Sequence, residues 1–229
     1  MEGRKIYTSS GETLFESDIK NLPFIGKGMF GSVYDYGDGK VIKIMDEPSI
    51  LCSYQGIAAV KRLKLSNYYR LYEILSEKPS SKIYIGSIGS YHRKENINIW
   101  EMPSEWLIEN YEKLYEDVSK LGRSKIAIYD TLPCNCIINS DGITVIDVDR
   151  YIKSKYECVE SNVRRLHREL FRPLLRCNYA EFHPNFSYDY EFERVLDELL
   201  QNFPQKKELA KILSKYPKPI DFLKDRINE

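Results

Sequence analysis

Three glycines between two short apolar runs place the strongest constraint on how this chain can fold. Residues 25–33 read Ile-Gly-Lys-Gly-Met-Phe-Gly-Ser-Val, with glycine at positions 26, 28 and 31. The flanking apolar residues favour two strands joined by a turn. Because glycine has no Cβ atom, the backbone N–H groups of such a turn can approach a phosphate closely. A glycine-rich hairpin that binds nothing is the commoner cause of this pattern, so a second signal is needed.

A lysine follows on the next apolar run. Residues 37–40, Gly-Asp-Gly-Lys, are typical of a tight turn, and residues 41–45 predict a third strand. Val41, Lys43 and Met45 share one face of this strand because side chains alternate. Lys43 can therefore supply the positive charge that a phosphate site requires. The alternative is a charge that protects a sheet edge from aggregation.

The other segments predict a mixture of strands and helices, so we expect the α+β class. A helix is expected at 67–77, with Ser66 as its cap, because Tyr68, Leu71, Tyr72 and Leu75 recur at helical spacing. A long helix is expected from Ser104 to Gly122. Pro103 indicates a boundary between an N-terminal unit, 1–102, and a C-terminal unit, 103–229. The remaining expected elements are strands at 5–7, 82–88 and 96–100, a strand hairpin at 136–138 and 143–146, and helices within 48–66 and from 161 onward.

Three polar residues form a second cluster near the expected hairpin. Asp130 precedes Asn135 by five residues, and Asp147 ends the second hairpin strand twelve residues later. Each of these residues alone is most often a loop or strand-end cap. In combination with the glycine turn and Lys43, their order and spacing match a known phosphoryl-transfer site.

These residues resemble the motifs of the protein-kinase-like superfamily over roughly residues 22–150. The glycine turn resembles the kinase glycine loop, and Val41-Ile42-Lys43 resembles its lysine strand. Asp130 and Asn135 keep the step of the catalytic loop, and Asp147 stands where the family has a metal-binding aspartate. The resemblance is to small atypical kinases, including secreted bacterial effector kinases. It implies a bilobal fold with an antiparallel-sheet N-lobe and a reduced, mainly helical C-lobe.

The resemblance implies an ATP- and Mg²⁺-dependent transfer of the γ-phosphate to a hydroxyl group, most readily a protein serine or threonine. Asp130 and Lys43 would be catalytic, and Asn135 and Asp147 would hold the metal. Glu73 would pair with Lys43, and Glu101 and Met102 would form the hinge that reads adenine. The nucleotide-binding set would be Ile25, Gly26, Lys27, Gly28, Phe30, Gly31, Val33, Val41, Lys43, Glu73, Glu101, Met102 and Ile137.

The chain departs from the family pattern in ways that keep two other functions open. Ile128 and Tyr129 replace the family's His-Arg, and Leu132 replaces its lysine. Val148 and Asp149 follow Asp147 in place of Phe-Gly, and no Ala-Pro-Glu follows. A small-molecule phosphotransferase, of the aminoglycoside- or choline-kinase type, also lacks the peptide-binding segment. A pseudokinase that acts as a partner-binding module would explain the lost motif residues.

Composition narrows the partners and the compartment. The 34 basic and 34 acidic residues give a formal net charge of zero, so no overall field favours nucleic acid or an anionic membrane. No apolar run predicts a membrane span, and residues 1–5 do not begin a signal peptide. Five cysteines and three scattered histidines indicate free thiols rather than a disulfide or zinc framework. We therefore expect a cytoplasmic protein, or a secreted effector in a host cytoplasm, with a protein substrate or regulatory partner.

Overall fold

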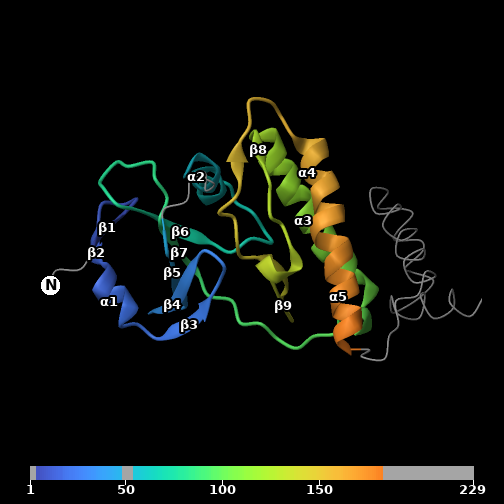
Figure 1. Cartoon of the computed structure of the whole chain (residues 1–229). Coiled ribbons are helices and arrows are strands. Elements are labelled where there is room, and N and C mark those ends of the chain that lie inside the picture. Colours follow the sequence, from blue (N-terminus) through green and yellow to red (C-terminus); the bar gives the residue numbers. More distant parts are fainter. Residues whose placement is uncertain (1–3, 48–53, 183–229) are drawn as a thin grey trace, which may run out of the picture.

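An antiparallel sheet of seven strands forms the N-terminal part of the molecule. The computed structural model describes residues 4–47 and 54–182 (Figure 1). The strand order is β2-β1-β6-β7-β5-β4-β3. The longer helices of the C-terminal part gather on the other side of the molecule, so the α+β class is confirmed (Figure 1). The strands are β1 (Lys5–Thr8), β2 (Thr13–Phe15), β3 (Phe24–Lys27), β4 (Gly31–Gly37), β5 (Lys40–Met45), β6 (Leu71–Ser76) and β7 (Gly86–Ser90), and a short helix, α1 (Glu16–Lys20), follows β2.

The glycine turn joins β3 to β4, and the predicted lysine strand is β5. Lys27 pairs with Ser32 across the turn, and the Gly28 N–H donates to the Gly31 carbonyl. On β5 the side chains alternate as expected. Ile42 and Ile44 are buried in one core cluster, whereas Lys43 lies on the opposite face, toward the helical part of the molecule.

The segment predicted as a helix at 67–77 is a strand, so this prediction is wrong. β6 lies between β1 and β7 in the sheet, and Leu71, Ile74 and Leu75 are buried. The aromatic and branched residues that gave a helical spacing also suit a buried strand. Before the strand, the Ser66 and Asn67 N–H groups donate to the Asp117 carboxylate, both at 2.7 Å, so Ser66 caps no helix.

The C-terminal part is built on the long predicted helix, α3 (Ser104–Arg123). Leu107, Tyr111, Leu114 and Val118 are buried along its apolar stripe, as expected. Its N-cap is Pro103 rather than Ser104, and Gly122 is a site of close packing against Val159, not the end of the helix. The other helices are α2 (Tyr54–Arg62), α4 (Val159–Arg165), α5 (Arg172–Phe182), the π-helix η3 (Leu166–Phe171), and two 3₁₀ turns, η1 (Ile99–Glu101) and η2 (Pro133–Asn135).

The predicted hairpin, β9 (Cys136–Asn139) and β10 (Gly142–Val145), lies between the sheet and the helices (Figure 1). Backbone hydrogen bonds join it to the start of β6: the Tyr69 N–H donates to the Val145 carbonyl at 2.9 Å, and the Val145 N–H donates to the Asn67 carbonyl at 2.7 Å. Two further short strands, β8 (Ile126–Ala127) and β11 (Ile152–Lys153), pair with each other beside α2. The N-terminal and C-terminal parts are therefore joined through the backbone as well as through side chains.

The connection from the sheet to α3 differs from the predicted one. The last sheet strand ends at Ser90, two residues beyond the predicted strand. Residues 91–98 contain no regular element, and the predicted strand at 96–100 is replaced by the 3₁₀ turn η1. Figure 1 shows this connection as a green segment that runs from the sheet to α3. The helices expected beyond residue 182, and the part of the first expected helix that falls at 48–53, lie outside the described residues, as do Cys52 and His183.

Candidate functional site

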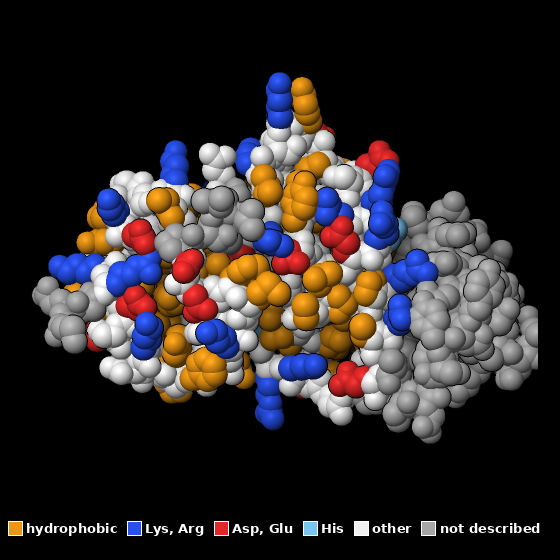
Figure 2. Space-filling view, viewed as in Figure 1, with side chains coloured by type: hydrophobic (Ala, Val, Ile, Leu, Met, Phe, Trp, Pro, Cys, Tyr) orange, Lys and Arg blue, Asp and Glu red, His pale blue; other side chains and the backbone are white. Residues whose placement is uncertain are grey.

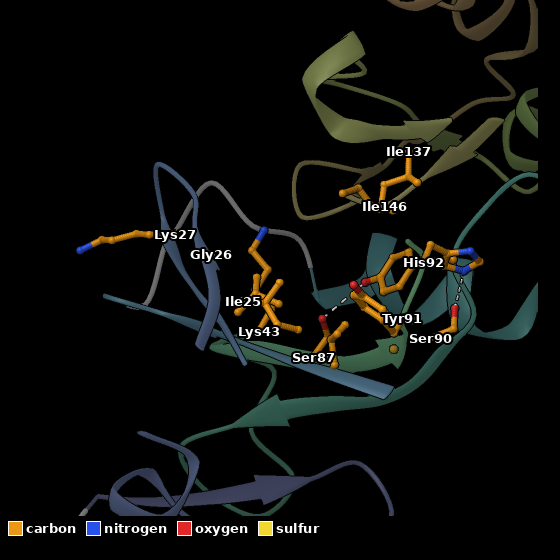
Figure 3. A pocket seen from close by; sticks show the side chains of 14 residues that line it. Ile25, Gly26, Lys27, Lys43, Ser87, Ser90, Tyr91, His92, Ile137 and Ile146 are labelled. Atoms are coloured by element: carbon orange, nitrogen blue, oxygen red, sulfur yellow. Dashed lines mark hydrogen bonds between the residues drawn. The ribbon is translucent and has the colours of Figure 1, made fainter. Parts of the chain in front are cut away.

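A cavity of about 290 Å³ lies between the sheet and the β9–β10 hairpin. Figure 3 shows Ile25, Lys43 and Ser87 on the sheet side and Ile137 and Ile146 opposite them. Figure 2 shows hydrophobic side chains gathered across the middle of the molecule on the viewed face, with charged side chains around them. The cavity is lined by Ile25, Gly26, Lys27, Val33, Val41, Lys43, Tyr69, Ser87, Gly89, Ser90, Tyr91, His92, Ile137 and Ile146.

Seven of the predicted site residues share this cavity: Ile25, Gly26, Lys27, Val33, Val41, Lys43 and Ile137. Among the described residues, no atom lies within 4 Å of a Cβ built on Gly26. Packing within the described chain therefore gives no reason for glycine there, whereas a bound group that approached the backbone would. The Lys27 side chain extends away from the cavity and pairs with Asp46 at 3.5 Å (Figure 3).

Lys43 lies between two carboxylates. Its Nζ is 2.8 Å from Asp147 Oδ2 and 2.6 Å from Asp149 Oδ2. Burial alone would lower the pKa of Lys43, but the charges of Asp149 and Asp147 and their hydrogen bonds raise it above its ordinary value. The ammonium group is therefore held in its charged form at the wall of the cavity, with partners on a segment 104 and 106 residues away in the sequence.

The two carboxylates differ in exposure. The Asp147 side chain is 30% exposed, and the Asp149 side chain is 5% exposed. Asp149 Oδ1 also accepts a hydrogen bond from the Tyr84 hydroxyl at 2.6 Å. Burial and the nearby Asp147 charge raise the pKa of Asp149, and Lys43 and Tyr84 act against this shift. The Asp147 carboxylate is therefore partly open to solvent, whereas the Asp149 carboxylate is enclosed by its protein donors.

Asp130 and Asn135 are brought together by their own loop. Asn135 Nδ2 donates to the Asp130 carbonyl at 2.7 Å, and the Ile146 N–H donates to the Asn135 carbonyl at 2.9 Å. Since Ile146 precedes Asp147, the loop and the end of the hairpin are fixed next to each other. Asp130 has a φ of 58°, a left-handed conformation that costs energy outside glycine and is found often at functional sites. The structure therefore brings together the segments that carry the three predicted polar residues, Asp130, Asn135 and Asp147, which we call the polar trio.

Arg150 joins this trio to the tip of the glycine turn. Its Nη1 is 3.7 Å from Asp130 Oδ2, and its guanidinium lies 5.3 Å from the centre of the Phe30 ring. The contact with Phe30 is a cation–π interaction across the mouth of the site. No sequence motif indicated this role, because Arg150 follows Asp149, a residue that departs from the family pattern.

Several predicted site residues do not line the cavity. Gly28, Phe30 and Gly31 belong to the turn beside it, and a Cβ on Gly31 would lie 2.2 Å from the Ile44 carbonyl oxygen, so Gly31 is needed for packing. Glu73 lies on β6 and pairs with Lys61 at 3.4 Å and with the Ser9 hydroxyl. The structure does not bring Glu73 to Lys43, and the helix predicted to carry it is absent.

The predicted hinge is also displaced. Glu101 and Met102 lie at and after the turn η1 and do not line the cavity. The cavity is instead bordered by Ser90, the last residue of β7, and by Tyr91 and His92 after it; Ser90 Oγ and His92 Nε2 are 2.8 Å apart. The incorrect helix assignment at 67–77 and the incorrect strand assignment at 96–100 moved the expected end of the sheet too far along the chain. If residues 71–76 had been predicted as a strand, the following strand would have been recognised as the last one of the sheet, and Ser90–His92 would have been the expected border of the cavity.

No family model matches the sequence, and no curated protein matches it either. In residues 4–47 and 54–182, no helix is both long and apolar enough to cross a bilayer. Within the same residues, no three His, Cys, Asp or Glu side chains are arranged as a metal site. A cation between Asn135 and Asp147 would therefore need further oxygen ligands from a bound molecule.

Proposed function

We propose that this chain is an ATP- and Mg²⁺-dependent phosphotransferase of bilobal, protein-kinase-like fold. The observation that carries the proposal is a chain of contacts that links Lys43, Asp147, Asn135 and Asp130 from distant parts of the sequence. Lys43 lines the apolar cavity, and the other three residues lie outside its lining. A scaffold has no need for these four groups in this order. The sheet and the cavity wall give the apolar surface that a purine ring requires, and the charged end suits phosphates.

The residues present fit magnesium and a nucleotide. Mg²⁺ is usually held in proteins by one or two side-chain oxygens together with substrate phosphates, and Asn135 and Asp147 supply such a pair. Asp147 is part-exposed. Asn135 donates its amide N–H to the Asp130 carbonyl, and its side-chain oxygen accepts a weak contact from the Cys134 thiol at 3.7 Å, which a cation would displace. When bound, the metal would neutralise phosphate charge. Lys43 would contribute a fixed positive charge, and Gly26 would leave its backbone accessible.

Asp130 is the group we assign to the acceptor hydroxyl. Its carboxylate is part-exposed at the mouth of the site, and its backbone is held by Asn135. In this role it would orient the hydroxyl and accept its proton as the phosphoryl group is transferred. Arg150 would limit the rotation of the Asp130 side chain, since its guanidinium lies beside one carboxylate oxygen.

The acceptor is assigned first to a protein serine or threonine and second to a small-molecule hydroxyl. One feature favours the second class: only residues 148–158 separate Asp147 from α4, and two of them pair with β8. This leaves a short segment where a peptide-binding surface would be needed. Protein kinases and small-molecule kinases use the same set of catalytic groups. The cavity therefore does not distinguish the two acceptor classes, and an assay with both kinds of acceptor is needed.

Incubation with γ-labelled ATP and Mg²⁺ tests the proposal. The wild type and Lys43→Met are each assayed alone, with a generic protein substrate and with a panel of small alcohols, and nucleotide binding is measured by calorimetry. We expect label transfer by the wild type and its near-complete loss in Lys43→Met, with circular dichroism unchanged, because the phosphates lose their positioning charge. Equal turnover by the folded variant would contradict the assignment of Lys43. A wild type that binds no nucleotide would favour a partner-binding module instead.

A further inference from the structure

Lys43 needs a permanent partner if Asp147 is to bind a cation. A buried ammonium group without an anion is costly, and a single carboxylate cannot fully serve both Lys43 and a metal. Asp147 Oδ1 accepts a hydrogen bond from the Asp149 N–H at 3.1 Å, and Asp147 Oδ2 contacts Lys43. A cation at Asp147 would therefore compete with these two donors. The question is which group holds Lys43 when Asp147 turns to another ligand.

The helix next to the sheet cannot supply that partner. No aspartate or glutamate occurs between Glu47 and Glu73, so α2 carries no carboxylate. Glu73, on β6, is engaged by Lys61, Ser9 and Ser10. Among the described residues, the anions in contact with Lys43 are those of Asp147 and Asp149.

Asp149 is fixed from a second side. Tyr84, which is 1% exposed, donates its hydroxyl hydrogen bond to Asp149 Oδ1, and it also lies 3.3 Å from the Ser87 hydroxyl. Tyr84 precedes β7, the neighbour of the lysine strand β5. The Asp149 carboxylate is therefore held between a lysine on β5 and the tyrosine that precedes the neighbouring strand β7, although its own backbone belongs to the segment after the hairpin.

The backbone of that segment is also constrained. A Cβ built on Gly56 would lie 1.7 Å from the Tyr151 carbonyl oxygen, so α2 packs directly on the chain two residues after Asp149. The Tyr151 hydroxyl is 2.9 Å from the Tyr68 hydroxyl, and Tyr151 is buried. These contacts leave little room for the Asp149 backbone to move away from Lys43.

We infer that Asp149 is the positioning residue for Lys43 and takes the place of a carboxylate on the helix. This inference rests on the proposed function and extends it. Asp149 keeps the ammonium group at the cavity wall, and Asp147 is thereby left to a cation. Because the lysine and its partner are joined without any charge on α2, the pair forms whenever the chain is folded, and no movement of that helix is needed to make it.

A double-mutant cycle on Lys43 and Asp149 tests this inference. Asp149→Asn, Lys43→Met and the double variant are compared with the wild type in kcat, in KM for ATP and in the calorimetric Kd for ATP with Mg²⁺. Tyr84→Phe is a second, milder probe, since it removes one hydrogen bond and leaves the Asp149 charge. Asp18→Asn, on exposed α1, is the matched control for the change from carboxylate to amide.

We expect Asp149→Asn to lower kcat/KM for ATP by about ten- to a hundredfold, as misplacement of a positioning group does. The two backgrounds are compared in the Kd for ATP with Mg²⁺, which Asp149→Asn should raise in the wild type. In Lys43→Met the same change should alter this Kd by less than about twofold, because the two residues act as a unit. Tyr84→Phe should give a smaller loss of the same kind if Asp149→Asn fails to fold. Wild-type constants for folded Asp149→Asn, or equal effects in both backgrounds, would overturn the inference alone. A wild type without nucleotide binding and transfer would overturn the proposed function as well.

Discussion

Three aspartates at the site, Asp130, Asp147 and Asp149, have the same side chain and different surroundings. Asp149 is buried between an ammonium group and a tyrosine hydroxyl, and Asp147 is part-exposed beside the same ammonium. Asp130 lies next to a guanidinium at the mouth of the site. Since environment decides what a carboxylate does, the proposed function would assign anchoring to Asp149, metal binding to Asp147 and proton acceptance to Asp130.

Asp147→Asn and Asp130→Asn should therefore fail in different ways. Asp147→Asn removes an anionic ligand, so we expect weaker nucleotide binding and a higher Mg²⁺ concentration for half-maximal rate. Asp130→Asn should bind nucleotide like the wild type and transfer phosphate about a hundredfold more slowly, the usual size of a general-base contribution. Calorimetry across a Mg²⁺ series and single-turnover kinetics separate the two effects. An unchanged Mg²⁺ requirement in Asp147→Asn would contradict its role as a ligand.

His167 gives a prediction about stability rather than activity. It stacks on Tyr111 with ring centres 5.9 Å apart, and its Nε2 is 3.0 Å from the Tyr111 hydroxyl. Burial lowers the pKa of His167, so the unfolded chain binds more protons than the native one near and below the ordinary value of about 6.5. The free energy of unfolding should therefore decrease as the pH falls through about 6.5.

His167→Phe keeps an aromatic ring against Tyr111 and removes the titration. Urea unfolding at pH 7 and near pH 5.5 should show a smaller acid-induced loss of stability in this variant than in the wild type. His92, whose pKa burial also lowers, remains in both proteins and contributes the same background. An identical pH dependence for the two proteins would show that His167 does not contribute.

At the scale of elements, local sequence patterns correctly predicted the helices and hairpins whose formation depends mainly on residues close in sequence. The hairpins at β3–β4 and β9–β10 follow from turn residues between short apolar runs, and α3 follows from a long apolar stripe. β6 could not be predicted in this way, because its residues fit either a helix or a strand. Its state depends on pairing with β1 and β7 and on the Asp117 carboxylate, all distant in sequence.

The same distinction applies to the site residues: those in local motifs were predicted, and those that depend on distant contacts were not. Lys43, Asp130, Asn135 and Asp147 follow from motifs with fixed spacing, and the structure brings them together. The border at Ser90–His92 and the second carboxylate at Asp149 depend on the topology of the sheet and on a buried tyrosine, which no local pattern indicates.

Gly56→Ala separates helix propensity from packing on α2. Alanine is preferred to glycine inside a helix by about 1 kcal/mol, which alone would stabilise the protein. The new methyl group would meet the Tyr151 carbonyl oxygen, and overpacking of this kind costs about 1–3 kcal/mol. We expect a net decrease in the free energy of unfolding, measured by urea denaturation. Gln55→Ala, an exposed change on the same helix, is the control and should have little effect. A more stable Gly56→Ala would contradict the close contact.

At the scale of the whole molecule, we predict activity that does not depend on phosphorylation after the hairpin. In regulated kinases, arginines that include one beside the catalytic aspartate bind such a phosphate, and Tyr129 occupies that position here. Tyr151 is buried, and its hydroxyl is hydrogen-bonded to the Tyr68 hydroxyl, so a kinase cannot reach it in the folded chain. The β8–β11 pairing orders the segment without a phosphate.

The measurement compares phosphatase-treated protein and the double variant Ser154→Ala, Tyr156→Phe with the wild type. Rates within about twofold are expected, which corresponds to less than about 0.5 kcal/mol in the barrier. A loss of about tenfold or more in both samples would show that a phosphorylation switch exists.

The backbone hydrogen bonds between Tyr69 and Val145 and between Val145 and Asn67 also limit how the molecule can admit a ligand. A rigid-body rotation that parted the sheet from the β9–β10 hairpin would have to break this ladder and strip Asp117 of two N–H donors at once. Such a wide opening has a high energetic cost. The glycine turn could bend without breaking these hydrogen bonds, because Met29 is 87% exposed there and Phe30 contacts Arg150 through its side chain alone. We therefore expect a ligand to enter and leave the cavity by bending of this hairpin, while the hydrogen bonds at Val145 stay in place.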